Sequence, residues 1–145
     1  MNDAKILGEF HFSELLGKPI HDNAGRLVGR IKDMAVCWDG LYPQVVGIKY
    51  ARKVHELIPI DRVETCGYEG VKLNGGFDAS QAVSLRENDI YIRKWLLDKQ
   101  IIDLKGSRMV RVNDIILSFI NSSENYQQML LVAVDIGVRG LFRRL

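Results

Sequence analysis

"LLGKPIHDNAGRLVGRIKDM" (residues 15–34) and "LLDKQIIDLKGSRMVRVNDI" (residues 96–115) are two related stretches of this chain. They align without a gap at an offset of 96 − 15 = 81 residues, and eight of the twenty positions are identical. Roughly one or two identities would arise by chance, so the chain contains an internal repeat. We call the two stretches, each with the hairpin that follows it, copy one and copy two. The identical pairs are Leu15/Leu96, Leu16/Leu97, Lys18/Lys99, Ile20/Ile101, Asp22/Asp103, Gly25/Gly106, Arg30/Arg111 and Asp33/Asp114.

A tight turn is predicted near the centre of each copy. Asp22 to Gly25 and Asp103 to Gly106 both read D-x-x-G. Aspartate at the start of a β-turn accepts hydrogen bonds from backbone amides, and glycine at its end adopts positive φ without strain. Apolar residues recur at a spacing of two around each turn, which is the period of a strand with one buried face. Each copy therefore predicts a hairpin of short strands.

The apolar residues change parity after this hairpin in both copies. They occupy odd positions before Asp33 and even positions after it, and the reverse holds around Asp114. A parity switch predicts a β-bulge or sharp bend, and a carboxylate beside it can accept backbone N–H groups left unpaired there. Trp38 follows the even pattern, so we expect it in the core. The next strand reaches residues 46–50 in copy one and 132–136 in copy two, an offset of 86, because the second loop is longer.

Several elements are predicted outside the repeated stretches. Ser13 is expected to cap one helical turn. Residues 57–60 read as an edge strand, since Pro59 cannot donate to a ladder. Residues 68–73 add a further strand. The sequence thus predicts an all-β fold of two small β barrels in tandem with short helical turns.

The predicted domain organisation follows the repeat. The first barrel spans residues 1–73, residues 74–89 form a polar, turn-rich linker, and the second barrel spans residues 90–145.

The end of the chain, "GVRGLFRRL" (residues 137–145), is predicted to form a short C-terminal helix. Its apolar residues follow the i, i+3, i+4, i+7 spacing of an amphipathic helix. With a helix there, copy two has no counterpart of the strand at residues 57–60. Either the chain is a fragment, or the open edge is covered by residues 5–12, by residues 68–73 or by the same edge of a second copy in a homodimer formed by strand addition. The apolar residues are Val138, Leu141, Phe142 and Leu145.

Composition excludes several classes of function. Twenty basic and 18 acidic residues give a net charge of +2, which offers no reason to expect direct nucleic-acid binding. No run approaches 18 apolar residues, and the N-terminus lacks a basic segment followed by an apolar one. We therefore expect a cytoplasmic protein without a membrane span. Cys37 and Cys66 lie outside any CxxC motif and are expected to be reduced.

The sequence offers no catalytic constellation or cofactor motif. His11, His21 and His55 are scattered and lack metal-ligand spacing. No G-x-S-x-G motif surrounds Ser13, and the glycines at residues 75–76 are not followed by GK[ST]. We therefore expect neither an enzyme nor a bound cofactor.

The repeated aspartates Asp22, Asp33, Asp103 and Asp114 allow two interpretations. Mg²⁺ prefers a few carboxylates with water in octahedral geometry, so these residues are the candidates for a metal site. Alternatively, two of them cap turns and two cap bulges. Recurrence in both copies favours the second interpretation, because a requirement of the fold recurs wherever the fold does. We therefore predict no metal site.

Four residues are candidates for binding a protein partner. Arg139, Phe142 and Arg143 lie on the C-terminal tail, where the helix would dock onto a following domain or, alternatively, onto an anionic lipid surface. Tyr42 lies at the aromatic tip of the first hairpin, a residue type that suits protein recognition.

Two stretches of copy one resemble the PRC-barrel family. They are residues 29–33, "GRIKD", and residues 58–63, "IPIDRV", separated by a hairpin. That domain is named for the H subunit of photosynthetic reaction centres and also occurs in ribosome maturation factors. The likeness covers about residues 12–64 and 90–138. It implies a small, mostly antiparallel barrel in each half.

Copy two is also similar to tandem PRC-barrel regions that precede the intracellular domains of MgtE-type magnesium-transporter relatives. The stretches are residues 96–115 and "LLVAVDIGVRGLFRRL" at residues 130–145. The resemblance implies a non-enzymatic regulatory or protein-interaction module that acts on a protein partner or on a downstream domain. The alternatives are a ribosome- or RNA-processing adaptor and a divalent-cation sensor that uses the repeated aspartates.

Overall fold

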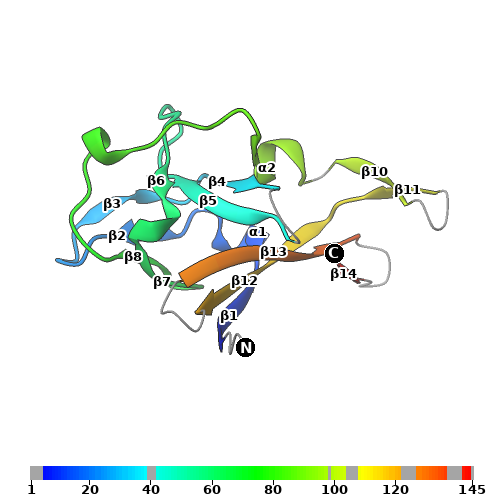
Figure 1. Cartoon of the computed structure of the whole chain (residues 1–145), viewed down its shortest axis with the longest axis horizontal. Helices are drawn as coiled ribbons and strands as arrows, with labels where there is room; N and C mark the ends of the chain where they lie inside the picture. The colour runs from blue at the N-terminus through cyan, green and yellow to red at the C-terminus, as the bar shows by residue number, and fades with distance from the viewer. Residues whose placement is uncertain are drawn as a thin grey trace.

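Strands dominate the computed structural model, which describes residues 5–38, 42–97, 99–103, 108–121, 127–136 and 142–144. They form sheets of eight, four and two strands (Figure 1). The α-helices among these residues, α1 (Phe12–Leu15) and α2 (Ile92–Trp95), are one turn each, and the 3₁₀-helices are η1 (Ile60–Arg62) and η2 (Ala79–Gln81). The prediction of a mostly β fold is confirmed. None of the three sheets closes on itself within the described residues.

The eight-stranded sheet combines strands from both halves of the chain. Its order is β1-β12-β13-β5-β4-β9, with β6 paired to β5 and β14 paired to β13. Every neighbouring pair is antiparallel. The strands are β1 (Lys5–His11), β4 (Asp33–Cys37), β5 (Gln44–Lys49), β6 (Ile58–Pro59), β9 (Asp89–Tyr91), β12 (Asp114–Asn121), β13 (Gln127–Asp135) and β14 (Phe142–Arg144).

The first strand of each half pairs with the other half. β1 lies beside β12, where Phe10 is opposite Leu117, and β9 lies beside β4, where Ile90 is opposite Val36. Each of these first strands leads directly into its one-turn helix, α1 or α2. The halves therefore share one sheet by exchanging a strand and a helix. The domain boundaries drawn around residues 74–89 stay a prediction.

Both copies carry a register irregularity in the strand after the aspartate. It falls between Ala35 and Val36 in β4 and between Ile116 and Leu117 in β12, at matching positions because 116 − 35 = 81. The strands are also interrupted directly before the aspartates, at residues 31–32 in copy one and 112–113 in copy two. The placement of Trp38 was wrong, because its side chain is 57% exposed. β4 ends at residue 37, so the alternation of the strand does not extend to it.

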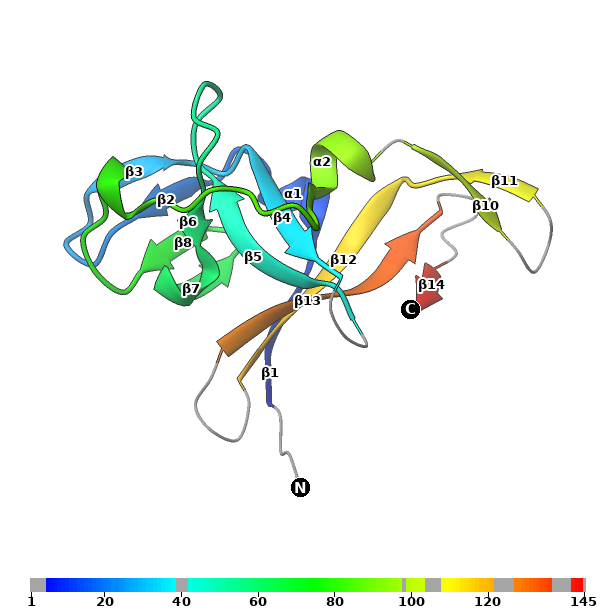
Figure 2. The same cartoon turned by 45° about the horizontal axis from the view of Figure 1, so that its top comes forward.

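Two smaller sheets flank the large one on opposite sides (Figure 2). One has the order β3-β2-β8-β7, in which β2 and β8 are parallel. The other is the hairpin of β10 and β11. The strand predicted at residues 68–73 is β8. The strands are β2 (Pro19–His21), β3 (Leu27–Arg30), β7 (Val63–Gly67), β8 (Gly70–Leu73), β10 (Gln100–Asp103) and β11 (Arg108–Arg111).

The turn predicted in copy one is confirmed. Gly25 has φ +83° and donates its N–H to the carbonyl oxygen of Asp22 over 3.1 Å. The corresponding turn in copy two includes residues 104–106, which lie outside the described part of the chain.

Apolar side chains from both halves pack into one core. This cluster joins Phe12 and Leu15 of α1 to the strand residues around both aspartates. The exchange of strands therefore also buries apolar surface between the halves, which is the main favourable contribution to folding. Fully buried large residues include Phe12, Leu15, Ile20, Ile31, Met34, Ile48, Ile92, Ile115 and Leu117.

The predicted C-terminal helix is wrong, because residues Phe142–Arg144 form strand β14 on β13. Val134 pairs with Arg143, and Ile48 pairs with Ile58 at the matching place in copy one, since 134 − 48 = 86. The tail thus takes the position that β6 takes in copy one. The edge of β13 at residues 133–135, which strand addition in a homodimer required to be free, is occupied.

Neither α1 nor α2 approaches the length of a membrane span, and no other helix in the described ranges is long and apolar enough to cross a bilayer. The structure places no disulfide at Cys37 or Cys66. Burial raises the pKa of the Cys66 thiol to about 12.

Gly47→Ala should destabilise the large sheet. A Cβ atom at Gly47 would lie 2.8 Å from Cβ of Leu57 and 2.9 Å from the carbonyl oxygen of Ile58, where β5 meets β6. Overpacking of this kind costs about 1–3 kcal/mol, which urea unfolding would measure. Gly67→Ala is the matched control, because its Cβ would meet no described atom within 4 Å. Equal losses in the two variants would contradict the steric argument.

Candidate functional site

Asp33 links the bulged strand of copy one to the helix of copy two. Its Oδ1 accepts hydrogen bonds from the backbone N–H groups of Met34 and Arg93, both at 2.8 Å, and its Oδ2 accepts one from Lys94 at 3.1 Å. Asp33 as a whole is only 5% exposed to solvent. Amides in the first turn of a helix have no acceptor within that helix, so the carboxylate satisfies groups that would otherwise be unpaired.

Asp114 makes the reciprocal link from copy two to copy one. Its Oδ1 accepts from the backbone N–H groups of Ile115 at 2.8 Å and Ser13 at 3.0 Å, and its Oδ2 accepts from the Ser13 hydroxyl at 2.5 Å. The prediction that Ser13 caps its own helix is wrong. His11 holds the N-cap position of α1 without a side-chain cap, and Ser13 donates to the other half of the molecule instead.

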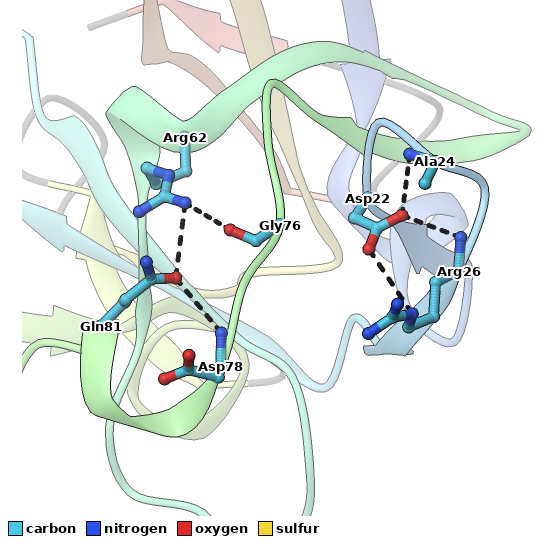
Figure 3. A network of polar contacts seen from close by, with 7 residues as sticks. All are labelled: Asp22, Ala24, Arg26, Arg62, Gly76, Asp78 and Gln81. Atoms are coloured by element: carbon cyan, nitrogen blue, oxygen red, sulfur yellow. Dashed lines mark hydrogen bonds and ion pairs between the residues drawn. The ribbon is translucent and has the colours of Figure 1, made fainter.

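Asp22 holds the first turn in place. Its Oδ1 accepts from the backbone N–H groups of Ala24 at 2.9 Å and Arg26 at 2.8 Å, and its Oδ2 lies 4.0 Å from Nε of Arg26 (Figure 3). The side chain of Asp103 lies outside the described residues. Within the described ranges, no group of three His, Cys, Asp or Glu side chains gathers as metal ligands. These contacts favour the capping interpretation of the aspartates.

A second polar network joins the predicted linker to η1, the 3₁₀-helix before β7. Nη2 of Arg62 donates to the carbonyl oxygen of Gly76 at 2.6 Å and lies 3.4 Å from Oε1 of Gln81 (Figure 3). The same Oε1 accepts from the Asp78 backbone N–H at 3.2 Å, which completes a capping box on η2. Residues 76–81 of the predicted linker therefore contact η1 and one another rather than extending away from the rest of the chain.

A basic pocket of about 400 Å³ opens beside Asp33. Five of its eight lining side chains are Lys or Arg, and Asp33 carries the one carboxylate among them. Copy one supplies residues before β4, at the end of β5 and in the loop after it, and the other half supplies residues of β9 and α2. The lining residues are Lys32, Asp33, Lys49, Arg52, His55, Tyr91, Arg93 and Lys94.

Tyr91 is buried within the pocket. Its hydroxyl donates to the carbonyl oxygen of His55 at 3.2 Å, and Nζ of Lys49 lies 5.6 Å from the ring centroid. Burial raises the pKa of Tyr91, and the negative charges of Asp33 and Glu56 raise it further. The hydroxyl therefore stays protonated near neutral pH, so the positive charge of the pocket comes from the lysines and arginines.

Burial also raises the pKa of Asp33 above its ordinary value of 3.8. The hydrogen bonds from the backbones of Arg93, Met34 and Lys94 act in the opposite direction, as does the charge of Arg93. These contacts stabilise the ionised carboxylate, so its burial costs less free energy than it would without them.

Three of the four partner-binding candidates belong to the described residues, and they lie along one edge of β13. Tyr42 is half-buried, and the neighbouring Pro43 carbonyl accepts the Leu131 N–H at 2.9 Å. Phe142 and Arg143 belong to β14, which pairs further along the same strand, and only their backbone is described. Arg139 lies outside the described residues. Whether these residues bind a partner stays a prediction.

Sequence reasoning missed the basic pocket. Its cations come from two segments, residues 32–52 and residues 93–94, and the net charge of +2 gives no hint of local clustering. Lys32 beside the repeated Asp33, and the adjacent Arg93 and Lys94, were the available signals.

No protein-family model matches this chain, and no curated protein matches it. The resemblance to PRC-barrel proteins stays a prediction.

Replacing either buried aspartate should lower the free energy of unfolding. Asp33→Ala and Asp114→Ala each leave buried amide donors without an acceptor, at a cost of about 1–3 kcal/mol measurable by chemical denaturation. Asp61→Ala is the control, because this aspartate is exposed. Changes within about 0.5 kcal/mol for both buried sites would show that the carboxylates do not support the fold.

The carboxyl group of Asp33 should titrate above pH 3.8 in the folded protein. Since the folded state then binds this proton more tightly than the unfolded state, the stabilising contribution of the group is full below pH 3.8 and declines as pH rises through the raised pKa. A carboxyl-carbon NMR titration measures the midpoint. A midpoint at or below 3.8 would mean that the amide hydrogen bonds outweigh burial.

Proposed function

We propose that this chain is a non-enzymatic regulatory and protein-interaction module, built from two PRC-type units and accessory to a magnesium-transporter-like protein in the cytoplasm. The motifs at residues 29–33 and 58–63 support the family assignment. The exposed strand β1 is the observation that carries the interaction function.

β1 is an open edge of the large sheet. It stands at one end of the strand order and, in the described part of the chain, pairs with β12 alone. Ile6 is 63% exposed and Leu7 is 43% exposed, whereas Phe10 at the other end of the strand is buried and packs edge-on against Tyr68. One end of β1 is thus anchored while its beginning extends from the body of the protein (Figure 2).

An exposed apolar edge strand is a template for strand addition. Its outward N–H and C=O groups can pair with an extended segment of another chain, while side chains such as Ile6 supply apolar contact. Monomeric proteins normally protect such an edge. A strand donated by the partner would provide that protection here, so we assign the partner-binding surface to residues 5–8.

The matched geometry around the two aspartates supports the two-unit description. Asp33 and Asp114 each accept from the next residue of their own strand and from the helix of the opposite half. A register shift follows each of them at the same distance. Two PRC-type units that exchange their first strand and helix would produce this pattern.

Site-specific photo-crosslinking in the native cell tests the proposal. A crosslinker at position 6 should capture a membrane transport protein, and Ile6→Lys should weaken that association without unfolding the chain, because the side chain is exposed. Leu27 is the matched control position, since it is also an exposed apolar residue on an outer strand.

Capture of ribosomal proteins at position 6 would support the adaptor function instead. Capture of this chain alone would replace the transporter partner with a homodimer. Equal capture at positions 6 and 27 would contradict the assignment of the binding surface to β1.

A further inference from the structure

The cations beside Asp33 are absent from the matching place beside Asp114. Lys32 corresponds to Asn113, and Lys49 corresponds to Asp135, at the offsets of 81 and 86 that the repeat establishes. The structure supports this match, because the Lys32 N–H donates to the Lys49 carbonyl at 2.8 Å and the Asn113 N–H donates to the Asp135 carbonyl at 2.7 Å. Two cations in one half are therefore replaced by an amide and an acid in the other.

The helices differ in the same way. Arg93 and Ser13 are matched by structure, at an offset of 80 rather than 81, because each is the second residue of its one-turn helix and its backbone N–H donates to Oδ1 of an aspartate in the opposite half. The residues that follow them are Lys94 and Glu14. The contact from the helix N–H to Oδ1 thus forms with serine as well as with arginine, whereas Oδ2 accepts from the Lys94 N–H at Asp33 and from the Ser13 hydroxyl at Asp114.

The difference between the two sites shows which residues support the fold and which do not. The aspartates occur in both copies, which fits their role as acceptors for backbone amides. The cations surround Asp33 and have no counterparts at the matched positions beside Asp114, so the amide contacts of the aspartates do not require them. Like charges brought together repel one another unless an anion lies between them. Their clustering around a pocket therefore indicates a ligand of negative charge.

We propose that this pocket binds a small polyphosphate group, of the pyrophosphate or tripolyphosphate class. Arg52 and Arg93 can hold phosphate oxygens through paired N–H donors, and the lysines supply further positive charge. Five cations against the single lining carboxylate of Asp33 suit an anion with several negative charges. Glu56, whose charge reaches Tyr91, lies outside the lining.

The lining also argues against a nucleotide base in the pocket. Tyr91 is only 8% exposed, and Lys49 lies over its ring, so this ring offers no open face on which a base could stack. The volume of about 400 Å³ is at the small end of ligand sites. A free polyphosphate and a bisphosphorylated lipid headgroup both carry several phosphate charges without a nucleotide base.

Binding here would join the two halves of the chain. Lys49 and Arg52 belong to copy one, whereas Arg93 and Lys94 follow β9 of the other half. An anion held by both sets would stabilise the folded state, because a ligand that binds only that state raises its stability by mass action. This site does not depend on the partner proposed for β1.

Calorimetric titration of the full chain with tripolyphosphate tests the site. We expect saturable one-to-one binding, weakened by added salt, and a higher melting temperature in the presence of the anion. The variant Lys32→Asn with Lys94→Glu introduces the residue types that stand at the matched positions beside Asp114, which are Asn113 and Glu14. It should bind at least about tenfold more weakly, since it loses charge-assisted hydrogen bonds. Lys53→Glu, an exposed change next to Arg52 in sequence, should bind like the wild type.

Vesicles distinguish the two sources of the phosphate group. Binding to vesicles with phosphatidylinositol bisphosphate but not with phosphatidylserine, together with weak binding of tripolyphosphate, would assign a lipid headgroup. Strong binding of tripolyphosphate without vesicle binding would assign a free anion. The proposal is overturned if neither ligand binds saturably, or if Lys53→Glu weakens binding as much as the pocket variant does, because attraction would then be a property of the whole surface.

Discussion

Two buried carboxylates, Asp33 and Asp114, satisfy backbone amides that the rest of the structure leaves without acceptors. Each accepts from the residue that follows it and from the one-turn helix of the opposite half. A one-turn helix has too few residues to satisfy its own amides. The exchanged strand and helix therefore dock where an aspartate carboxylate of the opposite half accepts the helix N–H groups. That docking brings the strands of both halves into the single large sheet.

The local part of this arrangement could be predicted from sequence, whereas the long-range part could not. The turn at Asp22 involves contacts within four residues, and both its acceptor and its glycine are visible in the motif. The helix amides that bind Asp33 and Asp114 lie 60 to 101 residues away. Periodicity describes which face of a strand is buried, but it carries no information about which distant segment covers that face.

The C-terminal tail illustrates why short patterns mislead. Its apolar spacing fits a helix, yet a helix of eight residues has little stability of its own, and pairing with β13 determines the outcome. The basic pocket escaped prediction for a related reason, since its cations converge only after the halves exchange strands. Asp33 belongs to both features, because its amide contacts hold α2 at the pocket that the cations surround.

The pairing of β1 with β12 also bears on how the chain is made. Ser13 contacts Asp114 across 101 residues of sequence, so the first strand emerges from the ribosome long before its partner exists. Contacts of such separation slow folding and leave apolar segments unpaired during synthesis. In a crowded polysome, β1 of one nascent chain could reach β12 of a neighbouring chain before its own. The same exchange that unites two halves of one molecule would then entangle two molecules, a form of domain swapping.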